Sequence, residues 1–169
     1  MTINLVNQTV LLLLADGVEA EETLNICSYF NQLGAQVTIA TPYNYITVET
    51  VSGHSRGADI LVDLPLSEIV PEDYQCLIVP SGLLAADLLK REASVAKLLD
   101  WFIQTGRLIM LSGEAEELLG ADADLQNHAL FRSNLELKSW LELGAIWLDS
   151  GEKVRSALIP PFKLVSPAL

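Results

Sequence analysis

The chain has 169 residues, half of them apolar, which is enough for one domain with a full hydrophobic core. Its formal net charge is −12, which argues against nucleic acid and anionic membranes as partners, because both bind basic surfaces. No apolar run approaches the roughly 18 residues that cross a bilayer, and no signal-peptide pattern begins the chain. We therefore expect a soluble, cytoplasmic protein that binds neither nucleic acid nor membranes.

Strand and helix patterns alternate along the first part of the chain. Residues 10–15 form a continuous apolar run, typical of a parallel strand covered on both faces. Residues 19–33 carry apolar side chains at helical spacing and acidic residues in the first turn, and Gly34 ends this predicted helix. Residues 36–40 predict the next strand, and residues 48–61 predict a hairpin or an irregular excursion.

The alternation continues to the end of the apolar pattern. Residues 75–80 predict a buried strand, and residues 83–105 predict helix, in one piece or two, ended by Gly106. Further elements are expected as a strand at 108–111, a short helix at 114–119, a helix at 135–143, and strands at 146–148 and 154–158. This order favours an open α/β sheet with helices on both faces.

We expect a single domain over residues 1–158. Residues 159–169 contain three prolines and no helical pattern, so we interpret them as a tail or linker, and the natural chain could continue beyond Leu169. The two cysteines, Cys27 and Cys76, lie in a helix pattern and a buried strand pattern. They do not suggest a disulfide framework, and we expect both thiols to be unreactive.

Ligands of open α/β sheets bind beyond the carboxyl ends of the strands, near the point where the strand order reverses. Three predicted turns meet this description, at residues 16–22, 80–83 and 112–117. The third turn lies between a predicted buried strand and a predicted helix, where an α/β hydrolytic fold would place a nucleophile elbow. We therefore expect the three turns to form one site.

The turns and their surroundings resemble the ThiJ/PfpI family of the class I glutamine-amidotransferase-like superfamily. Its Asp-Gly-Val-Glu-x-x-Glu opening is matched by Asp-Gly-Val-Glu-Ala-Glu-Glu at residues 16–22. Residues 52–63 resemble its glycine-containing excursion, and residues 73–82 its Asp-Tyr-Asp-x-Leu-x-Val-Pro-Gly-Gly segment. Residues 107–119 occupy its elbow, and residues 141–147 are similar to its Ala-Gly-Ala-x-Trp ending.

The resemblance covers roughly residues 8–158. It implies a three-layer α/β sandwich with a mostly parallel central sheet, of the flavodoxin-like or glutamine-amidotransferase-like type, that pairs as a homodimer. It also implies an intracellular protease, amidase or glutamine-amidotransferase-like activity. We expect no cofactor and no metal. The alternative, that the carboxylates of Asp16, Glu19, Glu22 and Glu114 converge on a hard divalent cation, competes with their being solvated helix starts.

The chain departs from the family at the elbow itself. The family carries a cysteine there, followed in many members by histidine, and a gap-free match places Gly113 and Glu114 at these positions. The family's Gly-Gly pair becomes Ser81-Gly82, whereas Glu22 matches the family glutamate that hydrogen-bonds the nucleophile. Glycine offers no nucleophile, and acidic side chains oppose the electrostatic stabilisation of an oxyanion or thiolate. We therefore do not expect cysteine-based catalysis.

Two residues remain candidates for catalysis. Ser112, one residue before the nucleophile position, would present its hydroxyl if the turn shifted in register, or it would cap the following helix. Glu22 would act as a general acid or base, or it would complement the helix dipole. The other residues expected to line the site are Ser81, Gly82, Gly113 and Glu114.

The sequence thus predicts a catalytically degenerate family member that acts as a small-molecule-binding or regulatory module for an unknown small molecule. A first alternative is a residual hydrolase, amidase or glyoxalase-type enzyme, with Glu22 as base and Ser112 or water as nucleophile. A second alternative, suggested by the proline-bearing tail, is one domain of a larger polypeptide.

Overall fold

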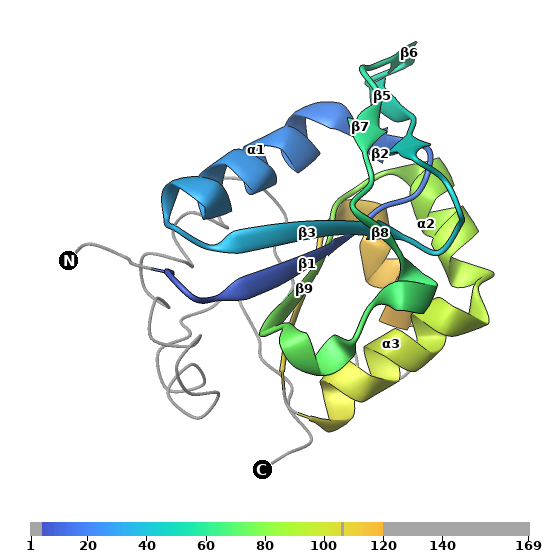
Figure 1. The fold of residues 1–169 in the computed structure, drawn as a ribbon. Helices are drawn as coiled ribbons and strands as arrows, with labels where there is room; N and C mark the ends of the chain where they lie inside the picture. The colour runs from blue at the N-terminus through green and yellow to red at the C-terminus, as the bar shows by residue number, and fades with distance from the viewer. Residues whose placement is uncertain (1–4, 106, 120–169) are drawn as a thin grey trace.

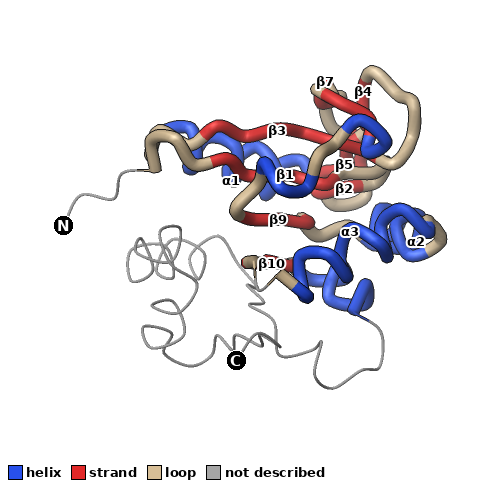
Figure 2. Tube along the Cα trace, turned by 60° about the horizontal axis from the view of Figure 1, so that its bottom comes forward, coloured by secondary structure: helices blue, strands red, loops and turns tan. Residues whose placement is uncertain are grey.

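The computed structural model describes residues 5–105 and 107–119 (Figure 1). Its centre is a sheet of five strands in the order β10-β9-β1-β3-β8, and every neighbouring pair in it is parallel. The strands are β1 (Thr9–Leu13), β3 (Gln36–Thr41), β8 (Leu64–Pro65), β9 (Cys76–Val79) and β10 (Leu108–Leu111). Figure 2 shows β3, β1, β9 and β10 side by side.

Helices cover the two faces of this sheet. Helix α1 (Ala20–Gln32) connects β1 to β3, whereas α2 (Leu83–Lys90) and α3 (Ala93–Gln104) connect β9 to β10. These two crossovers run in opposite directions along the sheet, so right-handed connections place their helices on opposite faces. Figure 1 shows α1 on one side of the strands and α3 on the other. The predicted α/β sandwich with a parallel central sheet is confirmed.

The core is built from the apolar runs of the sheet. Residues Val10, Leu11, Leu12 and Leu13 of β1 are fully buried, as expected for a strand with neighbours on both sides and helices on both faces. In α1, Ile26 and Phe30 are fully buried, four residues apart on one helical face. Each such side chain contributes about 1.5–3 kcal/mol of burial free energy.

An excursion between β3 and β8 carries the remaining short strands. These are β4 (Thr47–Val48), β5 (Thr50–Ser52), β6 (Ser55–Arg56) and β7 (Ile60–Leu61), and one more short strand, β2 (Val18–Glu19), lies between β1 and α1. Strands β5 and β6 form a hairpin, β4 pairs antiparallel with β7, and β5 also pairs with β2 in the turn after β1. The excursion predicted over residues 48–61 is therefore confirmed and is attached to the first site turn.

The structure corrects one predicted element. The segment predicted as a short helix over 114–119 is a 3₁₀ helix, η3 (Gly113–Leu119). The amide of Ala115 donates to the carbonyl of Ser112 at 3.0 Å, the three-residue spacing of a 3₁₀ turn. Two further 3₁₀ turns, η1 (Leu66–Glu68) and η2 (Pro71–Asp73), lead into β9.

Several predictions fall on residues that the structure does not describe. The role of Gly106, the helix at 135–143, the strands at 146–148 and 154–158, and the tail at 159–169 all lie outside the described residues. In the described part of the chain, none of the helices combines the length and hydropathy needed to cross a membrane.

Candidate functional site

The three predicted site turns meet at the carboxyl edge of the sheet. The connection from β1 runs to β3 on one side, and the connection from β9 runs to β10 on the other, so the strand order reverses between β1 and β9. Because all strands of the sheet are parallel, the turns that follow β1, β9 and β10 share one edge. This is the place where open α/β sheets bind ligands.

Glu22 and Ser81 join the first two turns. Glu22 lies in the first turn of α1, and Ser81 follows β9. The Ser81 backbone N–H donates to Glu22 Oε1 at 3.1 Å, and the Ser81 hydroxyl donates to Glu22 Oε2 at 2.6 Å. Hydrogen bonds to an ionised carboxylate are stronger than neutral ones, so this pair holds the two turns together. Both residues are half-buried.

Gly82 and Glu114 join the second and third turns. The Gly82 N–H donates to Glu114 Oε2 at 3.2 Å. The backbone of Glu19 completes the arrangement, because its N–H donates to the Ser81 carbonyl at 2.9 Å. Two successive backbone amides, those of Ser81 and Gly82, therefore donate to carboxylates of the protein itself.

Two glycines allow the turns to approach this closely. Gly82 has φ +147°, and a Cβ there would lie 2.5 Å from the carbonyl oxygen of Gly17. Gly113 has φ +54°, and a Cβ there would lie 2.9 Å from Cβ of Ser81. Both distances are shorter than side chains tolerate, and both φ values lie where glycine is favoured. Positions 82 and 113 must therefore be glycine for the turns to pack this closely.

The sequence left both Ser112 and Gly113 as candidates for the elbow apex, and the structure distinguishes them. Ser112 is 1% exposed, and its N–H extends the pairing of β10 with β9 by donating to the Val79 carbonyl at 3.1 Å. Gly113 follows it with positive φ and is exposed. A nucleophile elbow is a sharp, strained turn between a strand and a helix, and a positive φ is a strained conformation for most residues. These two observations favour Gly113 at the apex, and the burial of Ser112 counts against its hydroxyl as a nucleophile.

The site brings Ser81 into a contact that sequence reasoning did not anticipate. Ser81 was expected to line the site, and only the alternative of a residual enzyme paired Glu22 with a hydroxyl, that of Ser112, or with water. The replacement of the family's first glycine by serine, next to the matched glutamate, was the signal that could have identified the contact. Four of the six residues expected at the site are joined in two hydrogen-bonded pairs, Glu22 with Ser81 and Gly82 with Glu114, whereas Ser112 and Gly113 belong to neither pair.

Three of the four carboxylates considered as metal ligands, those of Asp16, Glu22 and Glu114, accept hydrogen bonds from the backbone or from Ser81. Asp16 Oδ1 accepts from the Glu49 N–H at 2.9 Å, while Glu22 and Glu114 accept from the turn after β9. Within residues 5–105 and 107–119, no group of three or more histidine, cysteine or acidic side chains is arranged to hold a metal ion.

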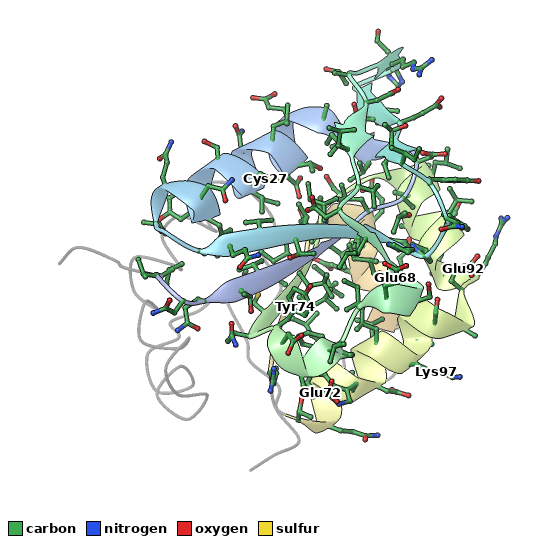
Figure 3. All side chains as sticks on the ribbon, in the orientation of Figure 1. Cys27, Glu68, Glu72, Tyr74, Glu92 and Lys97 are labelled. Atoms are coloured by element: carbon green, nitrogen blue, oxygen red, sulfur yellow. The ribbon has the colours of Figure 1, made fainter. Side chains whose placement is uncertain are left out.

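The two thiols lie away from the elbow. Cys76 is fully buried in β9, and burial raises the pKa of its thiol well above the ordinary value. Cys27 is half-buried on α1 (Figure 3), and its pKa is raised by burial and by the negative charge of Asp63. A raised pKa means a smaller thiolate fraction, so neither thiol has the environment of an activated cysteine.

We predict that both thiols react with iodoacetamide more slowly than an exposed cysteine at about pH 8, because less thiolate is present. Cys27 should react faster than Cys76, and unfolding in urea should remove the difference. Peptide mass spectrometry of the alkylated chain measures both rates. Equal rates for Cys76 in native and unfolded protein would contradict this prediction.

A five-stranded parallel sheet with helices on both faces and a site at its carboxyl edge defines a flavodoxin-like α/β protein. The model of the DJ-1/PfpI family matches residues 8–159. The chain belongs to the DJ-1/PfpI family, as its motifs predicted.

Solved structures support this assignment. Drosophila melanogaster DJ-1beta is 25% identical with a TM-score of 0.61, and the match covers 66% of this chain and 58% of that one. The VC2308 protein is 21% identical with a TM-score of 0.66, covering 91% of this chain and 94% of its own. A two-domain protein of Anabaena variabilis, containing DJ-1/ThiJ/PfpI-like and ferritin-like domains, is 17% identical with a TM-score of 0.59 over 71% of this chain and 32% of its own. The last two likenesses show the fold alone.

Proposed function

We propose that this chain is a DJ-1/PfpI-family protein without a nucleophile at its elbow and that it acts as a small-molecule-binding or regulatory module. The proposal rests on the hydrogen bonds that the turn after β9 makes. Its two successive amides, those of Ser81 and Gly82, donate to Glu22 and Glu114, while Gly113 stands at the elbow apex.

This arrangement is unfavourable for acyl transfer. Acyl transfer needs a nucleophile and preorganised N–H donors aimed at the developing oxyanion. Here the elbow apex carries no side chain, and the neighbouring amides are bound to carboxylates of the same chain. The carboxylates also repel an incoming anion, so the site favours a ligand that donates hydrogen bonds, such as an amine, over a carboxylate.

The remaining parts of the proposal come from the family resemblance. We propose a homodimer, located in the cytoplasm, that uses no cofactor and no metal. The domain is proposed to extend over residues 1–158, with residues 159–169 as a tail or linker.

The proposal predicts no turnover of methylglyoxal, activated acyl esters or activated amides above the buffer rate. Wild type, Glu22→Gln and Ser112→Ala, each verified as folded by circular dichroism, should give the same result. Small amines should raise the melting temperature of wild type more than carboxylic acids of matched size, and Glu22→Gln should reduce that difference. Wild-type turnover that is lost in Glu22→Gln would overturn the degenerate assignment.

One observation favours the alternative of a residual hydrolase or glyoxalase-type enzyme. The hydroxyl of Ser81 lies 2.6 Å from Glu22 Oε2, within the distance required between a nucleophile or bound water and its base. The turnover of the same substrates is therefore also measured for Ser81→Ala. Turnover that disappears in Ser81→Ala and Glu22→Gln but persists in Ser112→Ala would favour this alternative and identify the hydroxyl involved.

A second alternative is that the chain is one domain of a larger polypeptide. The Anabaena variabilis protein supports it, because that protein joins a DJ-1/ThiJ/PfpI-like domain to a ferritin-like domain. Coding sequence that continues in frame beyond Leu169 would favour this arrangement, and a stop codon at that point would count against it.

A further inference from the structure

Ser81 lies beside both Glu22 and the elbow residue Gly113. Its side chain and amide bind the two oxygens of Glu22, and its Cβ lies 2.9 Å from where a Cβ on residue 113 would be. We propose that Ser81 and Gly113 form a complementary pair. In this pair, residue 81 determines whether the elbow can carry a side chain and whether Glu22 has a free oxygen.

The steric part of the pair does not depend on a rotamer. Rotation of the Ser81 side chain about χ1 moves Oγ but leaves Cβ in place. The backbone of Ser81 is also held on both sides, by its N–H to Glu22 at 3.1 Å and by its carbonyl from the Glu19 N–H at 2.9 Å. A side chain on residue 113 would therefore have to displace the loop after β9 or the elbow itself.

The electrostatic part concerns Glu22. The Ser81 hydroxyl donates a hydrogen bond to Oε2 of that carboxylate at 2.6 Å, and the Ser81 amide donates one to Oε1. Glycine at position 81 would keep the amide contact, remove the hydroxyl contact and vacate the volume beside residue 113. A side chain introduced at the elbow would then face the freed carboxylate oxygen. The inference rests on the proposed function, because it explains how this site excludes a nucleophile at its apex.

A cycle of variants tests the steric part. Gly113→Ala is made in wild type, in Ser81→Gly and in Ser81→Ala, and the urea midpoint of unfolding is measured for each chain. Ser81→Ala is the matched control, because it keeps Cβ and removes only the hydroxyl. We expect Gly113→Ala to lower the midpoint strongly in wild type and in Ser81→Ala, and clearly less in Ser81→Gly. Some loss should persist there, because φ of +54° disfavours alanine.

The same loss in all three backgrounds would overturn the pairing. Because the cycle involves no substrate or ligand, its failure is distinguishable from failure of the proposed function. Substrate turnover by wild type would overturn the proposed function and leave the cycle unaffected.

A second measurement tests the carboxylate. Gly113→Cys is made together with Ser81→Gly, and alkylation of the new thiol by iodoacetamide is followed against pH, with the site assigned by peptide mass spectrometry. A neighbouring carboxylate disfavours the thiolate, so adding Glu22→Gln should lower the pH of half-maximal rate by about one unit. An unchanged pH profile would show that residue 113 does not face Glu22 and would overturn this part.

Discussion

Replacing Gly82 with alanine is expected to lower the free energy of unfolding by about 3 kcal/mol or more. The alanine Cβ would lie 2.5 Å from the Gly17 carbonyl oxygen and 2.9 Å from Cα of Val18. Both neighbours are backbone atoms of the turn after β1, so no side-chain rotation relieves the contact. The φ of +147° adds backbone strain for any residue with a Cβ.

The matched control for this variant is Gly53→Ala. Gly53 also has positive φ, +63°, but a Cβ there would meet no atom within 4 Å. It should therefore show only the conformational cost, about 1–2 kcal/mol. Urea denaturation of both variants measures the difference, with m-values compared to verify that the transitions are alike. Equal losses would mean that the turns after β1 and β9 are not in the close contact described.

Replacing Phe30 with alanine is expected to cost about 3–5 kcal/mol of unfolding free energy. Phe30 is fully buried and is among the largest side chains of the core. It attaches α1 to the sheet, and α1 carries Glu22 in its first turn. Deleting the ring leaves a cavity that rigid neighbouring strands cannot fill. Chemical denaturation measures the loss.

Leu24→Ala, on the same helix, is the control for this second variant. Leu24 is 54% exposed, so the same kind of truncation should change stability by about 0.5 kcal/mol or less. A loss for Leu24→Ala as large as that for Phe30→Ala would place Leu24 in a buried contact, such as the proposed homodimer interface. In that case the loss should depend on protein concentration.

Periodicity predicted most of the described fold. The run at residues 10–15 became the central strand β1, because a strand covered on both faces has no exposed side to mark with polar residues. The sequence predicted helix over residues 83–105 in either one piece or two, and the structure has two helices, α2 and α3, with a break between them. It falls at Arg91 and Glu92, and Glu92 has extended backbone at the start of α3. The 3₁₀ form of η3 was missed, because hydrophobic spacing over so few residues does not distinguish the two helix types.

The candidate site was located from the sequence, but its contacts were not. Parallel strands bring their following turns to one edge, so the order of the motifs was enough to place residues 16–22, 80–83 and 112–117 together. Which hydroxyl would meet Glu22 depended on the orientation of single side chains. Ser112 is buried beside Val79, whereas Ser81, on the neighbouring strand's turn, donates to the carboxylate.

By itself, the sequence determined the family, the parallel sheet and the absence of a nucleophilic side chain at position 113, since these follow from residue identity and periodic pattern. Only the tertiary structure decided that Gly113 has a positive φ after β10 and that Cβ of Ser81 lies where a side chain on residue 113 would begin. It also decided that the amides of Ser81 and Gly82 are bound to Glu22 and Glu114. The physical reason is that these contacts join residues on three separate turns over distances of a few ångströms, and no local pattern in the chain encodes such distances.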